Sequence, residues 1–227
     1  MKKLKKWKGL DHTTSLFLLL LSALFLEVVV TKALLLIWPE RETGWSASDI
    51  NKYFMPFMAL LIIPFWLKTP LEVRWSALKF RDRKMIGREM LVAVLVSAGI
   101  VLAIVGVRLW MNAHDPEAAA RPWFGLYLNV HGRWFYPLSV IVQEIMIKAF
   151  IQENIRRANT TDNKHITVIL TGLFFAILHM NYPLYYLVAA GLLCMLTGYL
   201  YERNGNIWDA VLIHFTLGFM PRALGMY

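Results

Sequence analysis

Charged residues and cysteine are both scarce in this chain of 227 residues. Only 17% of the residues are charged and 58% are hydrophobic, whereas a soluble domain has about 25% charged and about 45–50% apolar residues. The single cysteine, Cys194, cannot form an internal disulfide, so a disulfide scaffold is excluded. The mean hydropathy of +0.49 also excludes a disordered or collagen-like chain. Long apolar runs recur from residue 15 to residue 220 and indicate one polytopic membrane domain.

Seven apolar runs are each long enough, or nearly so, for a membrane helix, which takes about 20 residues. The predicted spans cover 15–38, 53–67, 90–111, 135–152, 165–181, 183–200 and 207–221. The sequence therefore predicts an all-α fold, a polytopic membrane bundle of about seven to eight helices. Within this one membrane domain we expect residues 1–134 to supply anchoring helices and residues 135–227 to form the functional core.

Basic residues are concentrated between the apolar runs, and Lys and Arg outnumber Asp and Glu by 24 to 15. This distribution is typical of loops that face anionic lipid, so the expected partner is the bilayer and not nucleic acid. With the N-terminus inside, sixteen of the 24 Lys and Arg residues fall in inside segments and five in outside segments. The positive-inside rule therefore predicts a cytoplasmic N-terminus.

Several charged side chains lie inside predicted spans, where each costs about 2.5–3.5 kcal/mol and needs a partner or a function. Glu27 and Lys32 in the first span are expected to form a structural pair. The fourth span contains Gln143, Glu144 and Lys148. Because Glu144 and Lys148 are four residues apart, they share a helix face and could pair. That pair could hold helices together, or the charges could serve a function.

Two histidines lie in later spans. His179 lies near the end of the fifth span, on the face that also carries Phe175, and His214 lies two turns into the seventh span among apolar neighbours. Alone, each could be a hydrogen-bonded structural residue. Together with Glu144 they could activate a water and stabilise an oxyanion, or form a metal site of two histidines and one carboxylate. The chain has no His-Glu-x-x-His sequence, so a zincin is unsupported.

Three spaced patterns in these spans resemble the motifs of a known family. They are Gln143-Glu144-x-x-x-Lys148, Phe175-x-x-x-His179 and His214-x-x-x-Gly218. They are similar to the Glu-Glu-x-x-x-Arg, Phe-x-x-x-His and His-x-x-x-Asn or Asp motifs of the CAAX protease and bacteriocin-processing (CPBP/ABI) family. These intramembrane proteases are similar to the type II CAAX prenyl endopeptidases. The resemblance extends over residues 135–221.

The resemblance implies a catalytic role for three residues. In the family, the glutamate pair and the first histidine are taken to activate water, and the last histidine and the asparagine to hold the oxyanion. Carried over to this chain, Glu144 is the general base, His179 assists it or orients the water, and His214 stabilises the oxyanion. The resemblance favours a metal-free mechanism with no cofactor, and zinc is the alternative that we retain.

The chain departs from the family pattern at three positions. Gln143 replaces the first glutamate and cannot usefully accept a proton at neutral pH. Lys148 keeps the positive charge but lacks the fork of an arginine. Gly218 removes an oxyanion donor, for which Asn181 could substitute. These departures predict a slow or specialised enzyme, since loss of one such donor costs a factor of about 10²–10³ in rate.

Two functions are the main hypotheses on the sequence, and a transporter is the remaining alternative, disfavoured because the polar residues within the spans are few. The first is an intramembrane endopeptidase that acts on a peptide or protein presented in the membrane, and the second is a catalytically impaired relative that acts as an immunity, scaffold or partner-binding protein. In either case we expect an integral protein of a bacterial plasma membrane. At 1.5 Å per residue, Glu144, His179 and His214 can meet only in the middle-to-outer half of the bilayer. The sequence thus predicts a site that opens to the extracytoplasmic side.

Overall fold

The structure is a computed structural model that describes residues 10–37, 67–79, 83–125, 136–161 and 163–226. These residues form helices and their connections, and no strand occurs among them. The prediction of an all-α fold is confirmed.

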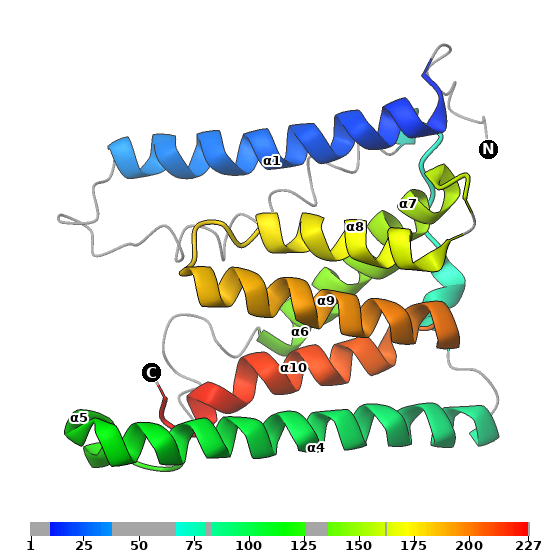
Figure 1. Ribbon diagram of the computed structural model, residues 1–227. Coiled ribbons are helices and arrows are strands. Elements are labelled where there is room, and N and C mark those ends of the chain that lie inside the picture. The colour runs from blue at the N-terminus through cyan, green and yellow to red at the C-terminus, as the bar shows by residue number, and fades with distance from the viewer. Residues whose placement is uncertain (1–9, 38–66, 80–82, 126–135, 162, 227) are drawn as a thin grey trace. The chain divides into compact units, whose positions relative to one another are not determined.

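Five long helices and one compound helix make up most of the described chain (Figure 1). The long ones are α1 (His12–Ile37), α4 (Arg83–His114), α8 (Lys164–Ile177), α9 (Leu184–Asn204) and α10 (Trp208–Ala223). The compound helix consists of α6 (Tyr136–Glu144), the π-helix η3 (Ile145–Gln152) and α7 (Glu153–Ala158), which follow one another directly. A 3₁₀ turn, η1 (Trp75–Leu78), and the short helix α5 (Pro116–Ala120) lie in connections.

The predicted spans agree with these helices wherever the structure describes the chain. The spans 15–38 and 90–111 correspond to α1 and α4, and the last four spans correspond to the compound helix, α8, α9 and α10. The predicted span 53–67 lies almost wholly outside the described residues. Three helices, His12–Ile37, Gly87–His114 and Leu184–Asn204, are long and apolar enough to cross a membrane.

The contacts divide the chain into two compact units, which we describe separately. The first unit contains Met1–Arg74 and Met146–Tyr199, and the second contains Trp75–Ile145 and Leu200–Tyr227. Each unit combines residues from both sides of position 135. The predicted division assigned residues 1–134 to anchoring and residues 135–227 to function. Because it concerns the roles of the helices and not their contacts, it stays a prediction.

The first unit has an apolar core to which α1, η3, α8 and α9 all contribute. Leu16 and Leu19 of α1 belong to the same buried cluster as Phe150 of η3 and Phe175 of α8. A Cβ on Gly172 would lie 3.2 Å from the carbonyl oxygen of Gly191 and would overlap the side chain of Met195. The missing side chain at position 172 therefore allows α8 and α9 to approach closely.

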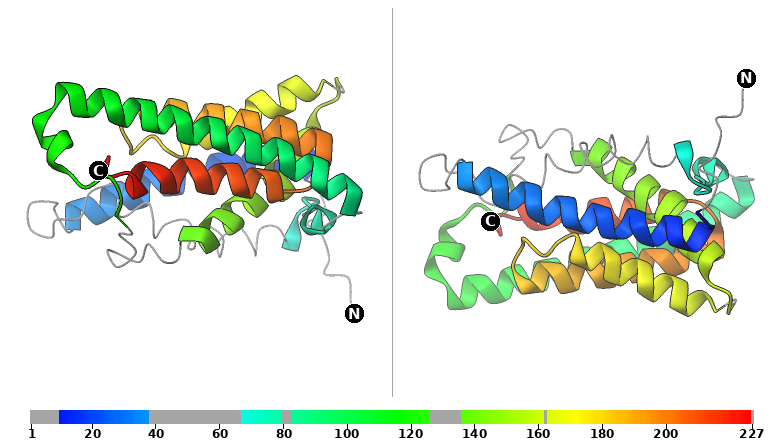
Figure 2. Two further views of the ribbon diagram at one scale, coloured as in Figure 1. Left: turned by 90° about the horizontal axis from the view of Figure 1, so that it is seen from below. Right: turned by 90° about the horizontal axis from the view of Figure 1, so that it is seen from above.

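In the second unit α10 lies alongside α4 and also packs against α6 (Figure 2). Side chains near its N-terminus fix its start. The Trp208 indole donates to the Leu78 carbonyl at 3.1 Å, and the Asn206 amide donates to the Glu89 carboxylate at 3.0 Å. The Asn206 side-chain oxygen also accepts from the Trp208 backbone N–H at 3.0 Å, as a helix-capping group does. These contacts set the position of His214 two turns further along.

Candidate active site

Glu144 and His214 meet in the second unit. Glu144 is the last residue of α6, and its carboxylate Oε1 lies 2.7 Å from His214 Nδ1 on α10. The side chains of Glu144 and His214 are only 5% and 10% exposed. A buried imidazole needs a polar partner, and α6 supplies one from 70 residues earlier in the chain. The structure therefore brings together two of the three predicted catalytic residues.

The hydrogen bond between these side chains constrains their protons. An ionised carboxylate only accepts, so Nδ1 of His214 carries the hydrogen. The other ring nitrogen, Nε2, can then donate a hydrogen bond only when the imidazole is protonated. The second carboxylate oxygen, Oε2, is buried and has no hydrogen-bond partner among the residues that the structure describes. The pair thus offers one oxygen that can accept a proton and one ring nitrogen that can donate.

Gly218, the last residue of the third motif, faces the hydroxyl group of a tyrosine. A Cβ built on Gly218 would overlap the Tyr136 hydroxyl oxygen and would lie 2.6 Å from Tyr136 Cζ. The space that an Asn or Asp side chain would need at position 218 is therefore filled by the phenol of Tyr136. Sequence reasoning missed Tyr136, because it belongs to none of the three motifs. The only signal for it was the absent side chain at position 218.

His179 lies in the first unit, just after the end of α8. Its Nδ1–H donates to the backbone carbonyl of Phe175 at 2.8 Å, and the rings of the two residues are 4.6 Å apart. The Phe-x-x-x-His spacing thus fixes the imidazole against the preceding helical turn. Because the carbonyl of Phe175 only accepts, Nε2 of neutral His179 carries a lone pair. Its predicted approach to Glu144 and His214 stays a prediction.

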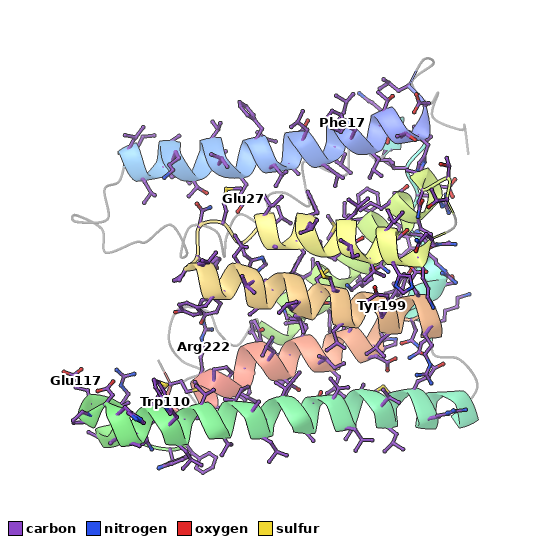
Figure 3. The ribbon with its side chains drawn as sticks, viewed as in Figure 1. Phe17, Glu27, Trp110, Glu117, Tyr199 and Arg222 are labelled. Carbon is purple, nitrogen blue, oxygen red and sulfur yellow. The ribbon has the colours of Figure 1, made fainter. Side chains whose placement is uncertain are left out.

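Asn181 contacts a carboxylate from α1. Its side-chain amide donates to Glu27 Oε1 at 3.4 Å, and Glu27 is buried on the side of α1 turned toward α8 and α9 (Figure 3). The predicted pair of Glu27 with Lys32 is wrong. Residues five apart on an α-helix point in different directions, and Lys32 is exposed. The use of Asn181 as a substitute oxyanion donor stays a prediction, although one of its amide hydrogens is already given to Glu27.

Lys148 lies in the first unit, where it is completely buried. Its ammonium donates to the carbonyl of Cys194 at 2.8 Å and contacts the thiol of the same residue at 3.2 Å. Four residues later, the Gln152 amide donates to the carbonyl of Gly198 at 3.1 Å. The pair that the sequence predicted between Glu144 and Lys148 is not formed, because each charge has its partner within its own unit. Lys148 lies in the π-helix that begins at Ile145, and there its ammonium group is turned to the carbonyl and thiol of Cys194.

We expect that replacing Lys148 by methionine leaves stability unchanged or raises it by about 1–4 kcal/mol. The buried ammonium bonds to a neutral carbonyl and a thiol, and an apolar chain of similar length removes the cost of desolvating the charge. Thermal unfolding in detergent can be followed by the reaction of a fluorogenic maleimide with the buried Cys194. Lys148→Ala is the control and should lower the midpoint, because it leaves a cavity. A lower midpoint for Lys148→Met would contradict this interpretation.

The remaining motif position, Gln143, is half-buried on α6 beside Glu144. Its role stays a prediction. Within the described part of the chain, no group of three His, Cys, Asp or Glu side chains is placed to hold a metal ion. The geometry that the structure does provide is the pair of Glu144 and His214 with Tyr136 on the same two helices.

Comparison with known proteins identifies the segment that carries this site. Residues 119–220, just under half of the chain, match the sequence model of the family described as Type II CAAX prenyl endopeptidase Rce1-like. All three motifs lie in the matched segment, and the predicted resemblance to the CAAX protease family is confirmed. Searches of curated proteins and of solved structures found no match. With three apolar helices of spanning length, the chain is an integral membrane protein.

Proposed function

We propose, because residues 119–220 match the sequence model of the Rce1-like CAAX protease family, that the protein is an intramembrane endopeptidase with Glu144 and His214 at its catalytic centre. The observation that carries the proposal is the buried hydrogen bond of 2.7 Å between these side chains. It joins the first and third motifs. A carboxylate and an imidazole in contact inside an apolar protein are the groups needed for acid–base catalysis and charge stabilisation.

In the proposed mechanism Glu144 is the general base. Its Oε2 accepts a proton from a water molecule as the water oxygen attacks the carbonyl carbon of the scissile peptide bond. Its Oε1 accepts a hydrogen bond from Nδ1–H of the His214 imidazolium. The other ring nitrogen of His214, Nε2–H, then donates to the oxyanion that forms. When the C–N bond breaks, the proton on Glu144 passes to the leaving amine. The products are a carboxylate and an amine. His179, with a lone pair on Nε2, orients the attacking water.

The proposal is tested by a cleavage assay in a membrane. The purified protein is reconstituted in liposomes with two quenched fluorescent peptides, one farnesylated on a cysteine near its C-terminus and one with the same sequence but no lipid. We choose this pair because the family description names prenyl endopeptidases. Cleavage of either peptide at one bond, identified by mass spectrometry, supports the proposal. Binding without cleavage favours the alternative of a partner-binding relative with an impaired site, for which Gln143 and Gly218 are the specific observations.

The metal-free mechanism is tested in the same preparation. We propose that activity does not depend on zinc, because Glu144 and His214 suffice for the steps described above. The protein should keep its activity after incubation with a chelator, and metal analysis should find less than one zinc per chain. Loss of activity with the chelator, and its recovery on adding zinc, would instead support a metal-dependent peptidase.

We predict that the loop containing α5 faces the outside and that the start of α8 faces the cytoplasm, as the charge distribution requires. Glu117 and Lys164 are exposed at these two places. A membrane-impermeant maleimide should label Glu117→Cys in intact cells and Lys164→Cys only after permeabilisation. The wild-type chain is the background, since Cys194 is 3% exposed. Labelling of Lys164→Cys from outside, with Glu117→Cys protected, would invert the topology and the predicted side of the site.

A further inference from the structure

We infer that the hydroxyl group of Tyr136 is a further catalytic group, which donates a hydrogen bond to the oxyanion beside His214. The inference rests on the proposed peptidase function and adds a residue outside the three motifs to its site. The observation behind it is that this hydroxyl lies where a side chain at position 218 would begin.

The position of the hydroxyl follows from the geometry of α10. His214 and Gly218 are four residues apart on this helix, so they share one face. Because a Cβ on Gly218 would overlap the Tyr136 oxygen, the hydroxyl stands directly over the backbone of Gly218, one helical turn from His214. Glu144 contacts His214 from the same helix, α6, that carries Tyr136. All four residues belong to the second unit.

The tyrosine ring is held in this position by aromatic neighbours. The centroid of its ring is 5.9 Å from that of Phe215, the residue after His214. Phe215 in turn stacks on Phe219, with ring centroids 5.1 Å apart and an angle of 13° between the planes. Tyr136 is half-buried at the first turn of α6. A preorganised donor is what oxyanion stabilisation requires, since the donor then needs no reorganisation during the reaction.

The chemistry of the phenol suits this task. A tyrosine hydroxyl keeps its proton at neutral pH and both donates and accepts hydrogen bonds. The donor that Gly218 cannot supply is thus available from the opposite helix. Asn181, the substitute considered from the sequence, lies in the first unit and donates to Glu27. Tyr136 is the better candidate because its hydroxyl group lies over Gly218 and it belongs to the helix that carries Glu144.

The test is the substitution Tyr136→Phe, which removes one oxygen atom and keeps the ring. We expect kcat for the cleaved peptide to fall by a factor of about 10²–10³, with KM and the unfolding midpoint nearly unchanged. A donor that contacts only the oxyanion acts in the transition state and not in substrate binding. Tyr199→Phe is the matched control. It also removes a hydroxyl group with a hydrogen bond, 2.9 Å from His165 Nδ1, at an exposed position of the first unit.

A second set of variants tests whether position 218 and Tyr136 share one task. Tyr136→Ala should be as inactive as Tyr136→Phe, and Tyr136→Ala combined with Gly218→Asn should regain part of the lost kcat, because the asparagine amide then has room to donate. Wild-type kcat for Tyr136→Phe would overturn this inference and leave the proposed function standing. So would a kcat loss matched by a lower unfolding midpoint. A wild-type protein that cleaves neither peptide would overturn both.

Discussion

Replacing Glu144 by glutamine should lower the rate of peptide cleavage by a factor of about 10²–10⁴, the range that a positioned general base contributes. Glutamine has nearly the same shape as glutamate, and its side-chain oxygen can still accept a hydrogen bond from His214 Nδ1. The variant therefore keeps the hydrogen bond that is 2.7 Å long in the wild type. What is lost is the ability of Oε2 to take a proton from water. This loss reduces the rate.

Two measurements make this prediction decisive. Glu117→Gln makes the same chemical change at an exposed position on α5 and should leave the rate unchanged. The unfolding midpoint of Glu144→Gln, read from the reaction of Cys194, should stay close to that of the wild type. If Glu144→Gln cleaves the peptide as fast as the wild type does, Glu144 is not the base. If neither protein cleaves but both bind the peptide, the partner-binding alternative is favoured.

The fold and the motif positions could be predicted because their signals are local. Long apolar runs with few charges are required of membrane helices, and they place α1, α4 and the last four helices, although α4 begins seven residues before its predicted span and the compound helix ends six residues after its own. The spacings within each motif are helical, so residues such as Phe175 and His179 fall on one face regardless of the tertiary structure. The family model matches the segment that contains these motifs.

The partners of the polar side chains could not be predicted, because they depend on contacts between distant segments. The spacing of Glu144 and Lys148 suggested a pair, but the Lys148 ammonium group donates to the carbonyl of Cys194 on α9, 46 residues away in the chain. His214 receives its carboxylate from another helix, and nothing in its own sequence neighbourhood identifies that residue. Tyr136 belongs to none of the three motifs. Its hydroxyl group lies over Gly218 because the missing side chain on α10 leaves room for the phenol from α6. A single sequence does not reveal that these two positions face each other.

Replacing His214 by leucine should destabilise the protein by about 3–5 kcal/mol, as removal of one partner of a buried charged pair does. The side chain of Glu144 is 5% exposed, and its Oε2 already lacks a partner among the described residues. Without His214, both oxygens would be buried with no hydrogen bond. The same variant should also lose cleavage by at least a factor of about 10²–10³, because the oxyanion donor is gone.

A double-mutant cycle separates the two consequences of this substitution. When Glu144→Leu is combined with His214→Leu, both polar partners are replaced by apolar groups, which is close to neutral for stability. The double variant should therefore unfold near the wild-type midpoint, well above either single variant, and the coupling free energy should be several times the error of such cycles, which is about 0.3–0.5 kcal/mol. It should nevertheless be inactive. Additive losses of stability would show that the contact between Glu144 and His214 is not formed in the membrane, and the proposed catalytic pair would then fail with it.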